Sequence, residues 1–363
     1  MSRAAGRLLV VVLGVLAVLT VAGPASAHVG GGTAGSDFDG RVLSVSPRLP
    51  GVSVRVLQFG DELELVNDTA TEIRVPGYDD EPYLRIGPDG IFENLRSPAT
   101  YLNASRKGTT SVPASADAAA PPQWRKVSDE PVARWHDHRV HWMGAQDPPT
   151  VRRDPGTTHV ILPHWTVDLR QGATPVVVSG DLTWVPGPTP LPWVLLIAAL
   201  VAVGLLVGRS RQWGPALSAL VVLLLVVDVV HSVGIAFAAA GTTGTHLIRL
   251  LTGSLLSIPV WAVGLLAVRW LSRKDLDGTH AAAFAGIFIA LLGGVSDVTV
   301  LYRSQVPFAF SISMARLLVA LTIGLGGAIV AAAVTLLVRR PLDGKPPALF
   351  TSRVQTPEPT PAA

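Results

Sequence analysis

The chain has 363 residues, of which 49% are hydrophobic and only 15% are charged, and its mean hydropathy is +0.43. This balance excludes an ordinary soluble domain and is typical of a membrane protein. The formal net charge is +3, yet residues 28–190 contain 15 Lys and Arg against 20 Asp and Glu, so the basic excess lies elsewhere and does not indicate nucleic-acid binding.

Residues 1–27 read as a signal peptide. Arg3 and Arg7 precede an apolar run over 8–22, and Ala25-Ser26-Ala27 forms a small-residue cleavage site. Cleavage there would make His28 the first residue of the mature protein. The alternative is an uncleaved membrane anchor.

Residues 28–185 predict an exported all-β domain. Alternating apolar and polar residues, bounded by turn formers, indicate strands, and they recur at 52–58, 62–68, 72–77 and 175–186. Seven to nine such strands predict an immunoglobulin-like or cupredoxin-like sandwich. Residues 186–192 form a proline-rich linker.

The chain contains no cysteine. Blue-copper centres, iron–sulfur clusters and cysteine-based zinc sites need thiolate ligands, so all three are excluded. An exported domain without disulfides must be held together by its own core.

A bundle of five membrane spans is expected over residues 193–340, and the tail 341–363 is expected to be disordered in the cytoplasm. Arg and Lys gather in alternate connections and at the C-terminal flank, which places the β domain outside and the C-terminus inside. The five apolar segments are 192–208, 214–240, 245–270, 280–302 and 309–338.

The run Arg134–Met143, "RWHDHRVHWM", holds three of the nine histidines of the chain. In a strand His136 and His138 would share one face, with His141 on the other unless a bulge intervenes. Two imidazoles on one face can hold copper or zinc, and Asp137 would assist only indirectly. The alternative is that these histidines make ordinary structural hydrogen bonds.

These residues resemble two copper-handling families. A processed N-terminal histidine before a β-sandwich resembles the CopC-type copper-binding domains, and its combination with a distant H-x-H resembles the cupredoxin-like part of the copper membrane monooxygenases. The resemblance implies copper, with zinc as the second choice, and implies other copper-handling envelope proteins as partners. The implied ligands are His28, His136 and His138, with His141 and His164 as further candidates.

The membrane segments contain a second group of polar residues. Ionisable side chains inside spans are costly and are functional candidates. Their positions loosely resemble the Asp/His/His site of the monooxygenase C subunits and, more distantly, the CopD-type membrane proteins. The alternative is that they lock helices together. The residues are Asp228, His231, His246, Arg249, Asp297 and Arg316.

The sequence therefore predicts a multi-pass protein of a bacterial plasma membrane that binds or traffics copper outside the cell. Its abundance of Arg, Ala, Val, Gly and Pro resembles that of actinobacterial proteins. The alternative is an envelope interaction or scaffold protein with a structural His/Trp-rich strand. No phosphate-binding loop, dinucleotide motif or nucleophile elbow is present, so binding is favoured over catalysis, although a copper oxidoreductase stays open. The membrane lipid is an expected partner and nucleic acid is not.

Overall fold

The computed structural model describes residues 35–106, 110–239 and 241–339. The expected signal peptide, His28 and the tail 341–363 lie outside these residues. The chain divides into a β unit, Thr33–Thr189 with the loop Tyr302–Pro307, and a helical unit containing Pro190–Leu301 and Phe308–Ala363.

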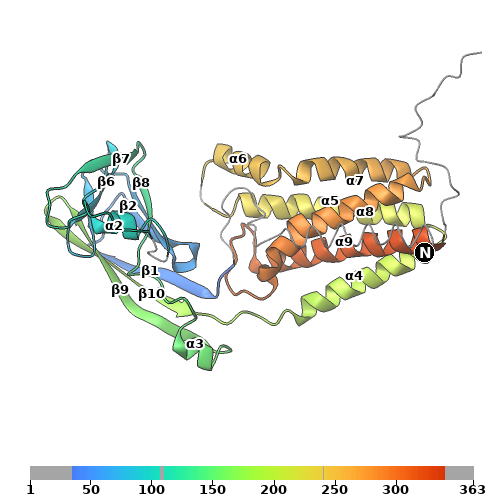
Figure 1. Ribbon diagram of the computed structural model, residues 1–363, viewed down its shortest axis with the longest axis horizontal. Coiled ribbons are helices and arrows are strands. Elements are labelled where there is room, and N and C mark those ends of the chain that lie inside the picture. Colours follow the sequence, from blue (N-terminus) through green and yellow to red (C-terminus); the bar gives the residue numbers. More distant parts are fainter. Residues whose placement is uncertain (1–34, 107–109, 240, 340–363) are drawn as a thin grey trace, which may run out of the picture. The chain divides into compact units, whose positions relative to one another are not determined.

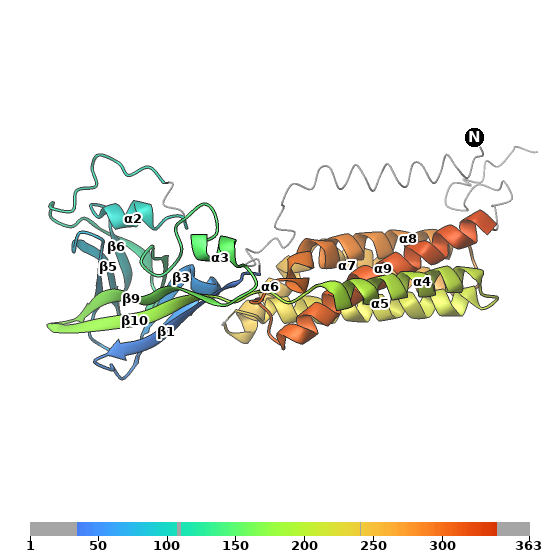
Figure 2. The same cartoon turned by 90° about the horizontal axis from the view of Figure 1, so that it is seen from below.

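The β unit contains two antiparallel sheets, whose strands Figures 1 and 2 show. Seven strands pair in the order β1-β10-β9-β4-β5-β6-β7, and three pair in the order β2-β3-β8. The strands are β1 (Phe38–Ser46), β2 (Val52–Leu57), β3 (Glu62–Asn67), β4 (Ile73–Pro76), β5 (Pro82–Gly87), β6 (Gly90–Asn94), β7 (Trp124–Ser128), β8 (Val132–His136), β9 (His159–Gln171) and β10 (Thr174–Trp184).

Both sheets contribute side chains to one core. Leu63 and Leu65 of β3 are buried together with Val176 and Val178 of β10. Because these residues are two apart within each strand, their side chains share a face. The four runs predicted as strands are confirmed at β2, β3, β4 and β10.

The prediction of seven to nine strands was too low, since the described residues form ten. The β unit also contains a 3-10 turn and two five-residue helices that the sequence did not indicate. They are η1 (Gln58–Gly60), α2 (Pro98–Leu102) and α3 (Pro149–Arg153). Each short helix begins at a proline, where the missing backbone N–H is not needed.

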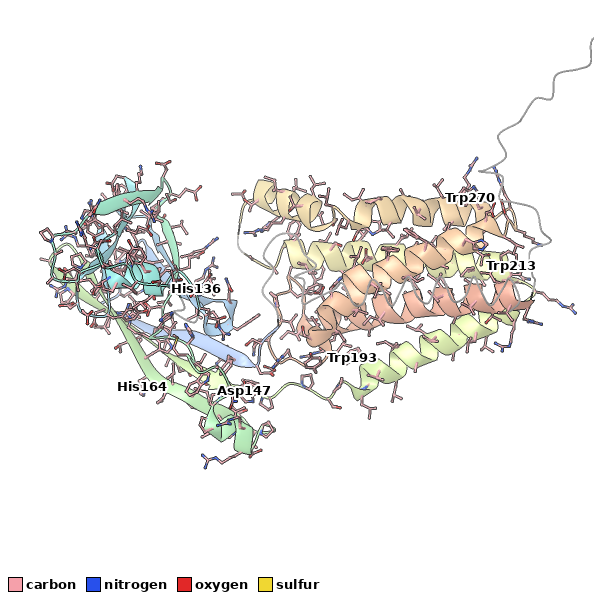
Figure 3. All side chains as sticks on the ribbon, viewed as in Figure 1. His136, Asp147, His164, Trp193, Trp213 and Trp270 are labelled. Atoms are coloured by element: carbon pink, nitrogen blue, oxygen red, sulfur yellow. The ribbon has the colours of Figure 1, made fainter. Side chains whose placement is uncertain are left out.

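The helical unit contains four helices that are long and apolar enough to span a membrane. The protein is therefore described as a multi-pass membrane protein, and Figure 1 shows its helices lying alongside one another. Tryptophans lie at both ends, Trp193 at one and Trp213 and Trp270 at the other (Figure 3). The elements are α4 (Leu191–Arg209), α5 (Trp213–Ala236), α6 (Thr243–Gly253), α7 (Ser257–Leu271), α8 (Asp277–Ile289), a π-helical turn η2 (Ala290–Gly294), a 3-10 segment η3 (Val295–Leu301) and α9 (Ile312–Arg339).

The segment 245–270, expected as one continuous span, is broken. Helices α6 and α7 meet at an angle of 68°, so the residues that the structure describes contain a fifth span only if this bent pair is counted as one. Pro259 lies in the first turn of α7, where its lack of an N–H is tolerated. In a continuous helix that position would be internal, and the proline would remove a hydrogen bond.

A charge ladder crosses the small sheet. Glu64 of β3 pairs in register with Arg55 of β2 and Arg134 of β8. Its carboxylate is 2% exposed and accepts hydrogen bonds from the Nε atoms of the two arginines at 2.5 and 2.7 Å. Burial alone would raise the pKa of Glu64, but the two guanidinium groups outweigh it and hold the pKa below its ordinary value.

We expect Glu64→Gln to destabilise the β unit at pH 7, because the native state then loses a carboxylate that it holds ionised. The pKa of Glu64 is lower in the native state than in the unfolded state, where it is about 4.3. The ionised carboxylate therefore stabilises the native state above pH of about 4.3, and this stabilisation is lost as the pH falls through the native pKa. The deficit relative to wild type should therefore shrink between pH 5 and pH 3. The measurement is thermal loss of the sheet signal in circular dichroism, with the exposed Glu130→Gln as the control. A deficit of the same size at both ends of this pH range would contradict the prediction.

Candidate functional site

The histidine-rich run is only partly a strand. Strand β8 ends at His136, and residues 138–140 form a turn in which the N–H of Val140 bonds to the carbonyl of Asp137. The alternation of faces expected through the whole run therefore stops at His136. His141 therefore does not lie opposite His138 as it would in an unbroken strand, because the turn brings the two ring centroids to 5.4 Å.

Asp137 fixes this turn from inside the protein. Its side chain is fully buried and accepts a hydrogen bond from the indole Nε1 of Trp135 at 2.9 Å. The guanidinium of Arg139 donates to both carboxylate oxygens, at 2.8 and 2.7 Å, and the backbone N–H of Arg139 donates at 3.1 Å. A buried carboxylate needs such compensation. The contacts hold the backbone on both sides of His138.

Tyr78, which the sequence did not single out, contacts the turn from the connection between β4 and β5. Its hydroxyl accepts the backbone N–H of His138 at 3.0 Å and donates to Asn103. Its ring stacks on the imidazole of His138, and Arg139 lies 5.2 Å over the same ring. Burial and the nearby Asp137 raise the pKa of Tyr78 to about 12, so the hydroxyl keeps its proton.

Each of two neighbouring imidazoles uses one ring nitrogen to bind a backbone carbonyl. The Nε2 of His138 lies 3.1 Å from the carbonyl of Ser105, and the Nδ1 of His141 lies 3.3 Å from the carbonyl of Trp142. A carbonyl accepts only, so both nitrogens must carry the proton. In the neutral form of each ring, this assignment leaves the lone pair on Nδ1 of His138 and on Nε2 of His141.

His141 is the more enclosed of the two. It is 3% exposed, and within the described residues its Nε2 has no hydrogen-bond partner. Burial lowers the pKa of His141, although the Trp142 carbonyl and Asp61 oppose that effect. The ring is therefore neutral at physiological pH. A buried acceptor without a partner costs free energy, and a ligand is one way to satisfy it.

The spacing of the two rings suits a shared ion. The ring centroids of His138 and His141 are 5.4 Å apart and the planes are perpendicular. Two imidazoles that bind one ion at about 2.0 Å per nitrogen have centroids roughly 5 Å apart. A carbonyl bonded to the other ring nitrogen is the usual outer partner of a metal-binding histidine.

The other predicted ligands are placed differently. His136 bonds through Nδ1 to the carbonyl of Asp61 at 3.1 Å, and its Nε2 lies 3.4 Å from Glu62. His164 is exposed on β9, and Figure 3 shows it on a different strand from His136. His28 lies outside the described residues. Within residues 35–339, apart from the gaps given above, no group of three His, Asp or Glu side chains is arranged to hold a metal ion.

A second set of predicted residues meets in the helical unit. Asp228 and His231 lie one turn apart on α5 and are both buried. The indole Nε1 of Trp261 on α7 donates to Asp228 at 2.7 Å, and Gly293 of the π-helical turn lies directly against the same carboxylate. Neither Trp261 nor Gly293 was singled out from the sequence. π-helical turns are frequent at functional sites.

His231 faces the irregular segment η3. Its Nε2 lies 3.4 Å from the carboxylate of Asp297, and its ring stacks on Phe308. Three of the remaining predicted residues bind backbone. His246 and Arg249 both donate to the carbonyl of Ala239 at 3.0 Å, and Arg316 donates to the carbonyl of Val300 at 3.3 Å. The structure thus joins His231 with Asp297, and His246 with Arg249, rather than all six residues.

Comparisons with known proteins add no assignment. No protein-family profile, curated protein or solved structure matches the chain significantly.

Gly293→Ala tests the contact between the π-helical turn and Asp228. A Cβ at this position would overlap the carboxylate oxygen of Asp228, so we expect the helical unit to lose about 1 to 3 kcal/mol of stability. Gly253→Ala is the matched control, because a Cβ there meets no atom within 4 Å. The measurement is thermal unfolding of the full chain in detergent, followed by helical circular dichroism. Equal melting temperatures for the two variants would rule out the close contact.

Proposed function

We propose that the protein binds a copper ion in its β unit, at the outer face of a bacterial plasma membrane. The imidazoles of His138 and His141 hold the ion through Nδ1 and Nε2, respectively. The single observation that supports this most is the buried Nε2 of His141, whose lone pair has no hydrogen-bond partner among the described residues. Copper favours imidazole ligands.

The donor set of the turn fits the ion that the resemblance implies. Both rings are oriented by carbonyls that fix the tautomer, and the turn is braced by Asp137 and Tyr78. Two ligands are too few for a tight site. We propose that His28 supplies a third group as the mature N-terminus and that His136 is a reserve ligand, whereas His164, exposed on β9, takes no part. By binding this ion, the protein would capture copper outside the cell or present it to other envelope proteins.

The two sheets are proposed to form a sandwich of immunoglobulin-like or cupredoxin-like type, since both contribute to one core. The helical unit anchors it, with five spans if α6 and α7 count as one. The basic connections are proposed to be cytoplasmic, which puts the β unit outside. Copper is preferred over zinc because of the resemblance to CopC-type and CopD-type proteins.

The double variant His138→Gln/His141→Gln should lose copper. We expect the secreted full chain to retain close to one Cu(II) after dialysis against a weak chelator, and the double variant to retain almost none. His164→Gln, changed at an exposed site on β9, should bind as wild type does. Elemental analysis gives the stoichiometry, and sheet circular dichroism checks that each variant is folded.

Full retention of copper by the double variant would contradict the site. If neither wild type nor the variants bind copper or zinc, and metal leaves the melting temperature unchanged, the turn is structural. The protein would then be an envelope interaction or scaffold protein, because a ligand that binds the native state must raise its stability.

The orientation can be tested because the natural chain has no cysteine, so a single introduced thiol is unique. We expect a membrane-impermeant maleimide to label Ser111→Cys and Ala239→Cys in intact cells. Ser272→Cys, in the connection between α7 and α8, should react only after lysis. All three positions are exposed. Labelling of Ser272→Cys in intact cells would reverse the proposed orientation.

A further inference from the structure

A polar cavity of about 250 Å³ lies where α4 and α9 end. It is lined by Gly208, Arg209, Ser210, Arg211, Leu336 and Arg339, so three of its six lining residues are arginines, one is a serine and none is acidic. Helix α4 is an apolar segment that ends at Arg209. In a membrane this end lies at the level of the lipid headgroups.

The cavity follows from a close helix crossing. Gly204 and Gly208 form a G-x-x-x-G pattern on α4, and a Cβ at either position would overlap α9, at Ala328 and Thr335 respectively. Small residues at this spacing let two helix backbones approach closely. Helix α4 ends one residue after Gly208, and the three arginines line the cavity at this end of the crossing.

Among the described residues, the arginines make few hydrogen bonds to the protein. Arg209 donates one hydrogen bond to the carbonyl of Leu205 at 3.1 Å, and Arg339 donates one to the carbonyl of Arg209 at 3.4 Å. These bonds satisfy carbonyls at helix ends. Each guanidinium has five N–H donors, so most of the donors around the cavity stay available for an anion.

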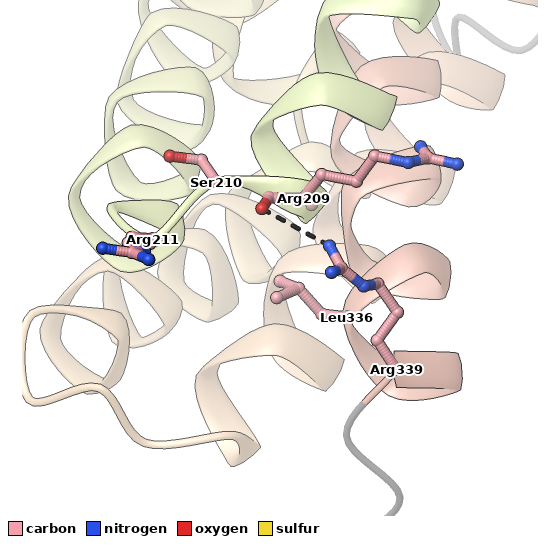
Figure 4. A pocket seen from close by; sticks show the side chains of 6 residues that line it. Arg209, Ser210, Arg211, Leu336 and Arg339 are labelled. Carbon is pink, nitrogen blue, oxygen red and sulfur yellow. Dashed lines mark hydrogen bonds between the residues drawn. The ribbon is translucent and has the colours of Figure 1, made fainter.

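The arrangement favours a group larger than a single phosphate ion. Figure 4 shows the side chains of Arg209 and Arg211 extending to opposite sides of Ser210, with Arg339 below, so the guanidinium groups do not converge on one point. A phosphodiester that carries hydroxyl groups offers oxygens over such a distance. Beside the cavity, the apolar side chains of Val203, Leu205 and Leu206 are exposed on α4, where acyl chains can lie.

We propose that this cavity binds the phosphodiester headgroup of an anionic phospholipid. The arginines contact the phosphate oxygens, the Ser210 hydroxyl contacts the headgroup, and the acyl chains lie along α4. The site is independent of the proposed copper site in the β unit. Basic pockets between membrane helices are a known mode of anionic lipid recognition.

The test uses the full chain, reconstituted in vesicles of phosphatidylcholine with a minor fraction of phosphatidylglycerol, and counts the lipids that remain bound in native mass spectrometry. The pocket variant is Arg209→Gln/Arg211→Gln/Arg339→Gln. The control is Arg269→Gln/Arg273→Gln/Lys274→Gln, which removes as many positive charges from the C-terminal end of α7 and the connection after it without touching the cavity. A thermal melt in pure phosphatidylcholine checks that both variants fold.

We expect wild type and control to retain phosphatidylglycerol in preference to phosphatidylcholine. The pocket variant should lose that preference by on the order of a hundred-fold, since each basic side chain near an anionic headgroup contributes about five-fold. Equal loss in the control would show a diffuse surface charge and overturn the site, as would an unchanged pocket variant. Displacement of the lipid by millimolar inorganic phosphate would assign the cavity to free phosphate instead.

Discussion

The burial of Asp137 is the constraint on which the candidate metal site depends. A carboxylate with no exposed surface must be compensated, and here Trp135, Arg139 and the backbone of the turn all donate to it. These contacts end strand β8 and force the chain to turn at His138. This turn places the ring of His138 beside that of His141 and buries His141. Without the carboxylate the run could continue as a strand, and the two imidazoles would face opposite sides of the sheet.

Each of the two units contains a further buried carboxylate that is compensated by specific neighbours. In the β unit Glu64 is buried between two arginines, and in the helical unit Asp228 is buried against an indole N–H and the backbone of Gly293. Neither aspartate nor glutamate is tolerated in such places without a specific neighbour. Gly293 lies in the π-helical turn, and a side chain at this position would overlap the carboxylate of Asp228.

The sequence predicted the parts of the fold that follow from periodicity. Alternation located β2, β3, β4 and β10, and long apolar runs located α4, α5 and α9, because one physical pattern dominates each of these segments. The sequence prediction missed the break between α6 and α7. The apolar composition of this segment predicted one span, whereas Pro259 disfavours a continuous helix there. For the candidate site, the sequence singled out the run that contains His138 and His141, but it grouped His136 with His138 on one face of a strand. The turn depends on Asp137, and on Tyr78 and Ser105, which are distant in sequence, so no local pattern could reveal it.

The central claim is that His138 and His141 bind one ion through the nitrogens that the carbonyls leave deprotonated. X-ray absorption at the copper edge, on the full chain loaded with Cu(II), counts imidazole ligands directly through their ring scattering. Our account predicts that the count falls by one in His141→Gln and by one in His138→Gln, while His164→Gln matches wild type. An unchanged imidazole count in both single variants would contradict it, and the copper would then have to be bound elsewhere in the chain.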